Sequence, residues 1–174
     1  MRCLFYIVKG DNMSDLKRQL RNLDMSRLKM KNGSSVETEL KRHAGILADC
    51  IMDSLANEVY ESYTPKMYVR SYRLYDSLYI DDFLRVDITA RGTNLSIGLH
   101  FDDGAVHIGF NGEDANTAVL LNEGFQTHGS FKDIPYLGYR TGTHFIEKGI
   151  EKYKEKVNNP FMVKFTINDE ERIF

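Results

Sequence analysis

The stretch SSVETELKRHAGILADCIMDSLANEVYES, residues 34–62, decides the fold because it carries the clearest apolar stripe of the chain. Ser34 and Glu37 fit a capping box, in which Ser34 caps a helix and Glu37 reaches back to its N-terminus. Apolar residues then recur at spacings of four or seven, which predicts one long amphipathic helix over residues 36–62. These residues are Val36, Leu40, Leu47, Ile51, Leu55 and Val59. Pro65 ends the predicted helix, because proline disfavours helical geometry in the residue before it.

The hydrophobic period changes to two residues between positions 82 and 110. Apolar and polar residues alternate over residues 84–89, 95–101 and 106–110, and turn-forming residues separate these segments. The pattern predicts a meander of three antiparallel strands, with an apolar face on the long helix and a polar face opposite. A second, shorter amphipathic helix and a terminal strand complete an α+β fold. These two elements are predicted over residues 141–157 and 161–168.

Length and composition predict a single domain over residues 1–174, because 42% of the residues are hydrophobic and 28% are charged. Residues 1–12 contain a possible appended strand. Residues 123–140 combine glycines with aromatic residues, which predicts a long irregular loop that orders on meeting a partner and serves as an assembly interface.

The composition argues against several classes of function. A net charge of −2 gives no bulk attraction for nucleic acid. The two cysteines have no zinc spacing, and Cys50 is expected to be a buried, reduced thiol. The longest apolar run is too short to span a bilayer or to form a signal-peptide core, so a cytoplasmic protein without membrane association is expected. No hydrolase, metalloprotease, phosphate-loop or dinucleotide motif occurs, so no catalytic residue and no cofactor are expected.

Histidines supply the one enzymatic alternative. His100 and His107 flank Asp102 and Asp103, so two imidazoles and a carboxylate could converge on a metal if the strands were in register. Solvated or hydrogen-bonded histidines on a polar sheet face explain the same pattern. His144 lies where a helix begins and could help to bind an anion there.

Residues 58–79, EVYESYTPKMYVRSYRLYDSLY, contain six of the ten tyrosines, one lysine and two arginines. Aromatic and basic residues at this density are typical of a contact surface. Tyrosines three or four apart predict a short helix over residues 68–79. Tyr68, Tyr72 and Tyr75 are expected to be packed, and Tyr60, Tyr63, Arg70 and Arg73 to lie nearer the surface. Stacking of single-stranded nucleic acid on the tyrosines is the alternative.

Two of these segments resemble a known family. The stretch EVYESYTPKMYVRSYRLYDSL is similar to a tyrosine-, proline- and arginine-containing motif of the neck proteins of long-tailed double-stranded DNA phages. These are called head–tail joining, tail-completion or minor tail proteins. LLNEGFQTHG (residues 120–129) and GTHFIEKGIEKYKEK (residues 142–156) resemble that family's second motif and its C-terminal helix. The matches span about residues 34–156.

The resemblance implies a structural virion protein without catalytic residues or cofactors. It implies a ring, by tail symmetry a hexamer, between the connector or stopper and the tail-tube or tail-terminator proteins. DNA would pass through the lumen without specific binding. The protein would occupy the host cytoplasm during assembly and then the virion. The motif positions that carry over as core or interface residues are Tyr60, Tyr63, Pro65, Tyr68, Arg70, Leu74, Asn122, Glu123, Gly124, Phe125 and Phe145. Gly149 stands where the family often has alanine, which is expected to loosen its helix by up to about 1 kcal/mol.

Overall fold

The structure of the 174-residue chain is a computed structural model, and it describes most of the sequence. The described stretches are residues 2–6, 29–30, 33–62, 72–82, 84–89, 92–102, 106–108, 114–131, 134–167 and 170–174. Helices and short antiparallel sheets alternate along them, which confirms the predicted α+β class.

A five-stranded antiparallel sheet forms the base of the molecule, with strand order β11-β10-β1-β5-β2. Its strands are β1 (Arg2–Tyr6), β2 (Leu78–Ile80), β5 (Gly98–Phe101), β10 (Met162–Ile167) and β11 (Glu170–Ile173). Strand β1 pairs with β10 on one side and with β5 on the other. The strand considered as an appendage is therefore the centre of the sheet.

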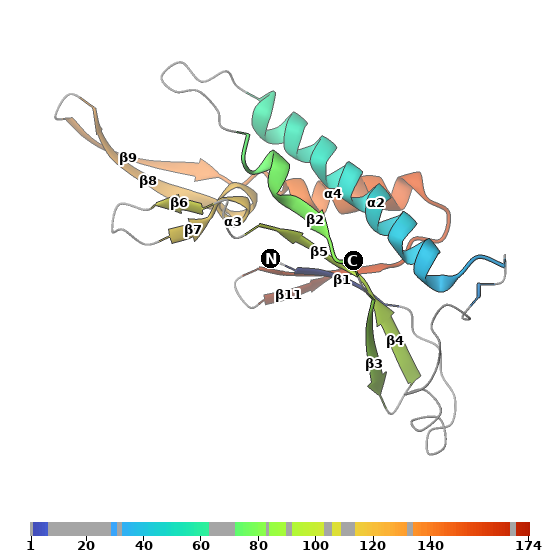
Figure 1. Ribbon diagram of the computed structural model, residues 1–174. Coiled ribbons are helices and arrows are strands. Elements are labelled where there is room, and N and C mark those ends of the chain that lie inside the picture. Colours follow the sequence, from blue (N-terminus) through green and yellow to red (C-terminus); the bar gives the residue numbers. More distant parts are fainter. Residues whose placement is uncertain are drawn as a thin grey trace.

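Two helices cover one face of this sheet (Figure 1). Helix α2 spans Val36–Leu55 and continues without a break into the π-helical segment η2, Ala56–Tyr60, and helix α4 spans Phe145–Lys156. The predicted long and short amphipathic helices are thus both present. The cap of α2 differs by one residue from the prediction, because Ser35 rather than Ser34 accepts the hydrogen bond from the Thr38 backbone N–H, at 3.0 Å.

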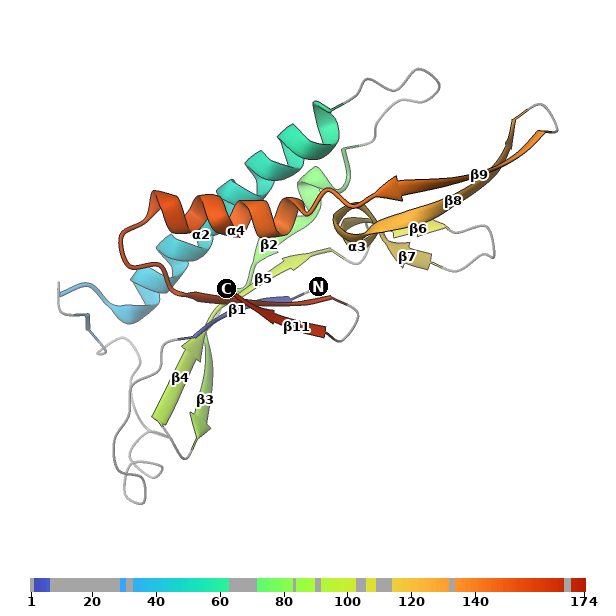
Figure 2. The same ribbon diagram turned by 180° about the vertical axis from the view of Figure 1, so that it is seen from behind.

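The core lies between the helices and the sheet. Strand β10 alternates between buried and less buried residues, and its buried positions Val163, Phe165 and Ile167 line the helix side. From β5, Phe101 meets Phe145 of α4 edge to face, with ring centroids 5.9 Å apart. Figure 2 shows from behind that α4 runs across α2 above the sheet. The apolar stripe predicted for α2 is confirmed as core. Its fully buried members are Leu40, Leu47, Ile51 and Leu55.

The predicted meander is wrong in its pairing. Strand β3 (Arg85–Thr89) pairs with β4 (Gly92–Ser96) as expected, but β4 ends before Ile97 and β5 pairs with β1 and β2 instead. Strand β6 (Val106–Ile108) pairs with β7 (Asp114–Asn116) and not with β5. The reason is that β5 pairs with β1, which is far away in the sequence. The predicted meander had paired this segment with the strand that follows it in the sequence.

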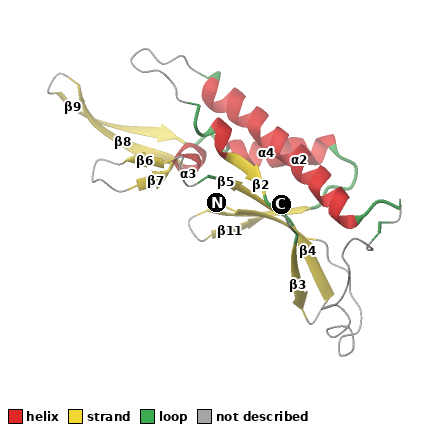
Figure 3. Ribbon diagram, in the orientation of Figure 1, coloured by secondary structure: helices red, strands yellow, loops and turns green. Residues whose placement is uncertain are grey.

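The predicted irregular loop over residues 123–140 is a two-stranded ribbon. Helix α3 (Thr117–Glu123) leads directly into β8 (Gly124–Phe131), which pairs along its whole length with β9 (Ile134–Thr141). The ribbon and the β6–β7 hairpin leave the same end of the molecule, whereas β3–β4 points away from the sheet elsewhere (Figure 3).

Two further expectations are corrected. Residues 68–79 do not form a three-turn helix in their described part, because only the 3₁₀ turn η3, Tyr75–Ser77, precedes β2. The terminal strand predicted over residues 161–168 could extend the sheet of a neighbouring subunit only if one of its edges were free. Strand β10 already has β1 and β11 on its two sides, so it has no free edge to offer.

Gly149 has a role that helix propensity does not predict. A Cβ at this position would lie 2.6 Å from Ile51 Cα and 2.8 Å from Ile51 Cγ1, so α4 rests directly on the backbone of α2. A methyl group there would push two helices apart rather than tighten one. In contrast, a Cβ at Gly45, in the middle of α2, would meet nothing within 4 Å.

We therefore predict opposite effects of the same substitution at these two glycines. Gly149→Ala should lower the free energy of unfolding by about 1–3 kcal/mol through overpacking. Gly45→Ala should raise it by up to about 1 kcal/mol, because alanine has the higher helix propensity. Urea denaturation of both variants measures this. Equal stabilisation of both would show that α4 and α2 do not touch at Gly149.

Candidate functional site

The α3–β8 junction, where the ribbon begins, is built around the buried Asn122. The Asn122 Oδ1 accepts a hydrogen bond from the backbone N–H of Ile146 at 3.0 Å, and the Asn122 backbone carbonyl accepts one from the N–H of His144 at 3.1 Å. Asn122 thus supplies an acceptor for Ile146, in the first turn of α4, and one for His144, just before the helix. The helix start considered as an anion site is therefore already occupied by a side chain of the protein.

Two glycines make this corner possible. Gly124 has a φ of +90°, and a Cβ there would lie 2.6 Å from the Arg140 carbonyl oxygen. A Cβ at Gly142 would lie 2.3 Å from the Asn122 carbonyl oxygen. The left-handed φ and the close approach of two backbones both require glycine. The two ends of the ribbon are consequently fixed to the start of α4.

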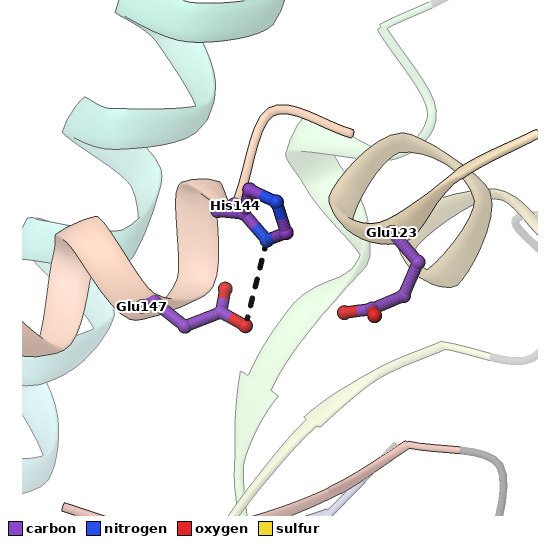
Figure 4. Close-up of side chains that lie close together, drawn as sticks. All are labelled: Glu123, His144 and Glu147. Atoms are coloured by element: carbon purple, nitrogen blue, oxygen red, sulfur yellow. Dashed lines mark ion pairs between the residues drawn. The ribbon is translucent and has the colours of Figure 1, made fainter. Parts of the chain in front are cut away.

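An ionic cluster lies beside this corner and joins three elements. Arg172 of β11 binds Glu123 with two hydrogen bonds, Nη1 to Oε1 at 3.0 Å and Nη2 to Oε2 at 2.8 Å. The same Nη1 donates to Glu147 Oε1 at 2.7 Å. His144 Nδ1 lies 3.8 Å from that oxygen. Figure 4 shows Glu123, His144 and Glu147 facing one another from α3 and the start of α4.

Glu123, His144 and Glu147 are also the residue types that bind a metal ion, and one ligand atom from each lies within 4.8 Å of the other two. However, Arg172 already binds three of the four carboxylate oxygens. The remaining one, Glu147 Oε2, is buried and has no hydrogen-bond partner among the described residues. A cation could use this cluster fully only by displacing Arg172. The arrangement is therefore better suited to holding elements together than to metal chemistry.

The charges in the cluster stabilise each other. The hydrogen bonds from Arg172 lower the pKa of Glu123, and the bonds to Glu123 raise the pKa of Arg172. Asn122 Nδ2 donates to Glu123 Oε1 at 2.8 Å and adds to the lowering of that pKa. Glu123 is thus held ionised by two partners on different elements.

The predicted motif residues divide into two groups. The second motif comes together at the corner, where Asn122, Glu123 and Gly124 are consecutive, and Phe125 packs against the core. Phe145 is fully buried beneath the first turn of α4. From the first motif, Leu74 is buried and Tyr60 packs against the core. The other members lie outside the described residues. They are Tyr63, Pro65, Tyr68 and Arg70.

The burial of the described tyrosines, Tyr60, Tyr72 and Tyr75, is the reverse of the expectation. Tyr72 and Tyr75 are 52% and 42% exposed, whereas Tyr60 is partly buried. Tyr60 stacks on Tyr72, with ring centroids 5.0 Å apart, and meets Tyr75 edge to face. Tyr72 has a φ of +54°, which is uncommon for an aromatic residue. Because Tyr60 is anchored at the end of η2, it occupies the inner position and the later tyrosines lie outside it.

The strand register that a metal site at His100 and His107 would require is not present, because β5 and β6 belong to different sheets. His100 is buried rather than solvated, and its Nε2 lies 3.0 Å from Asp81 Oδ1. Arg85 donates to the other Asp81 oxygen at 3.0 Å. Gly98 leaves room for this group, since a Cβ there would lie within 2.5 Å of both Asp81 Oδ2 and His100 Nε2. The group ties β2 to β5 and the start of β3.

Sequence reasoning missed a buried polar pair between the helices. His43 Nδ1 lies 2.7 Å from the Tyr153 hydroxyl, which also accepts the Phe161 N–H at 3.0 Å. Arg42 lies 2.8 Å from His43 Nε2 and can only donate, so the ring carries its proton on Nδ1 and donates to Tyr153. Burial lowers the pKa of His43, which favours this neutral form. The sequence did contain a sign that His43 is buried: it lies three residues after Leu40, on the apolar face of the helix.

Arg172 was also missed. Charged residues dominate the sequence around it, and no apolar alternation marks β11 as a strand. As expected, Cys50 is buried, and burial raises the pKa of its thiol.

Comparison with known proteins identifies no relative: no family model, no curated protein and no solved structure matches the chain. In the part of the chain that the structure describes, no helix combines the length and the apolar character needed to cross a bilayer.

The Glu123–Arg172 pair should make stability depend on pH. Because the folded pKa of Glu123 is depressed, its stabilisation is fully present above about pH 4.3, the ordinary glutamate pKa, and is lost as pH falls through the folded value. Glu123→Gln should cost about 1–2 kcal/mol at neutral pH and almost nothing at the acid end. Chemical denaturation of both proteins between pH 3 and 7 measures the difference. A difference that does not vary with pH would contradict the assignment.

The Tyr153 hydroxyl should contribute measurably to stability. Tyr153→Phe leaves the Phe161 N–H and the His43 Nδ1–H without their acceptor in a buried place, so the free energy of unfolding should fall by about 1–3 kcal/mol. Tyr139→Phe is the matched control, because Tyr139 is 69% exposed and should tolerate the change. Equal thermal midpoints for the two variants would refute the role of the hydroxyl.

Proposed function

We propose that this chain is a structural subunit of the neck of a long-tailed double-stranded DNA phage. It would act in a ring that completes the tail or joins it to the head connector. The observation that carries the proposal is the β8–β9 ribbon. Its first strand contains residues 124–129, which belong to the segment that resembles the family's second motif, and beyond its root the ribbon extends away from the core (Figures 1 and 2).

The shape of the subunit supports an assembly role. In the described part of the chain, each ribbon strand pairs only with the other, so each has an outer edge available for contacts. Tyr139 on β9 is 69% exposed and supplies a large amphipathic side chain on this arm. A ring requires a head-to-tail interface between two different surfaces of the subunit, and a projecting arm is one way to provide the first surface.

The remaining parts of the proposal follow the sequence resemblance. The partners would be copies of the chain, six by tail symmetry, together with connector or stopper proteins and tail-tube or tail-terminator proteins. DNA would pass through the lumen without specific binding. The protein would assemble in the host cytoplasm and remain in the virion. It would need neither a cofactor nor catalytic residues, and the residues of the ionic cluster would serve to fix the arm.

Binding of single-stranded nucleic acid is the second candidate, and one observation favours it. Tyr72, Tyr75 and Tyr79 are all exposed near one edge of the sheet, and exposed Arg73 lies between them in sequence. Exposed aromatic and basic side chains stack bases and contact phosphates in such proteins. The net charge of −2 weighs against this candidate.

Loss of the gene should give full heads and separate tails, and complementation separates the two candidates. We predict that Tyr139→Ser folds normally but lowers the yield of joined particles about tenfold or more, since buried interface aromatics dominate binding energy. Tyr72→Ser tests the alternative and should leave joining unchanged. Electron microscopy counts joined particles. Normal virions from the null phage would exclude the neck role.

The nucleic-acid candidate has its own readout. Fluorescence anisotropy with a labelled single-stranded oligonucleotide should show no binding at physiological salt if the neck role is correct. Tight, steeply salt-dependent binding that Tyr72→Ser abolishes and Tyr139→Ser leaves intact would favour the alternative instead.

A further inference from the structure

The last strand of the chain contacts the rest of the molecule in two different ways. Backbone pairing joins β11 to β10, with Phe165 opposite Arg172 in the register. Arg172 then extends over the Phe165 ring, with its guanidinium carbon 5.6 Å from the ring centroid, and reaches the carboxylates of Glu123 and Glu147. One side chain therefore connects an outer strand of the sheet to α3 and to α4.

Glu123 is a sensitive place for this connection. It is the last residue of α3, and Gly124, the first residue of the ribbon, follows it directly. Asn122, on its other side, supplies acceptors for Ile146, in the first turn of α4, and for His144, just before the helix. The guanidinium thus binds the residue at which helix, ribbon and second helix meet. The bidentate geometry fixes the direction of the Glu123 side chain as well as its charge.

The strand that carries Arg172 lies at one edge of its sheet. It is an outer strand of four residues, with β10 as its only partner among the described strands, and Ile173 on it is 60% exposed. Short outer strands open more readily than central ones. The ribbon root depends through Arg172 on one of the least protected elements of the sheet.

We infer that Arg172 is a latch that couples the docking of β11 to the position of the β8–β9 ribbon. While β11 is docked, Glu123 is held and the ribbon root is rigid. When β11 leaves the sheet, Glu123 and Glu147 lose their common partner and the root becomes free to move. A protein that pairs with or displaces β11 would in this way change the freedom of the ribbon. The coupling follows from the contacts alone and does not rest on the proposed phage role.

Hydrogen exchange measured by NMR tests the latch, because the root has identifiable amides. The N–H groups of Gly124, Thr143 and His144 all bind carbonyls of α3. Arg172→Ala should speed their exchange about tenfold relative to amides of α2. The matched control is Glu171→Gln, because Glu171 lies on the same strand as Arg172. This substitution removes the 2.9 Å ion pair between Glu171 and Lys164 of β10 but leaves Arg172 in place. It should not alter exchange at the root.

Reciprocity supplies the decisive result, since a coupling between two sites acts equally in both directions. Glu123→Gln, at the ribbon root, should speed the exchange of the Phe174 N–H, which binds the Val163 carbonyl at 2.8 Å. A change at the root without a change at Phe174 would overturn the latch, as would unaltered root exchange in Arg172→Ala. If Arg172→Ala speeds exchange equally in α2 and α4, the variant is globally destabilised, and Glu123→Gln alone decides.

Discussion

The close approach of α4 to α2 at Gly149 is the contact on which the rest of the structure depends. It lets the backbone of one helix lie against Ile51 of the other, so both helices fit above a sheet of only five strands. The first residues of the same helix, α4, contact two other parts of the molecule. Phe145 reaches Phe101 in the core, and Ile146 receives its acceptor from Asn122. The apolar contact at Gly149 and the polar corner at Asn122 are thus joined through one helix.

From that corner the organisation of the molecule follows in short steps. Asn122 fixes the start of α4, Gly124 turns the chain into the ribbon, and Arg172 binds Glu123 between them. These residues come from two regions of the sequence, residues 122–124 and residue 172, that share no local pattern. The cluster also shows why a group of carboxylates and a histidine need not be a metal site. A guanidinium already neutralises the charge that a cation would neutralise, and it makes directional bonds that fix the elements.

Local periodicity was sufficient to predict α2, α4 and β10, because each of these elements buries one regular face whatever its partners are. It failed where the cause was distant. Strand β5 pairs with β1, some 95 positions earlier, and no turn signal encodes that choice. The ribbon was missed for a different reason: beyond its root, where Phe125 packs against the core, it extends away from the core and needs no alternation of apolar residues. At Gly149, helix propensity predicted a weakness, but the neighbouring helix reverses the sign of the effect.

The hydrogen-bond partners of His43, His100 and Glu123 show what these polar side chains do in the fold. The imidazole of His43 binds a tyrosine between the helices, that of His100 binds Asp81 at the sheet edge, and Glu123 is bound by Arg172. In each case a residue type that often performs catalysis is saturated by partners that hold elements together. A catalytic group needs a face directed at a substrate, and these three are directed at the protein itself. Among the described residues, most of the large hydrophobic side chains that the fold leaves exposed are tyrosines, a residue type that is enriched where one macromolecule contacts another.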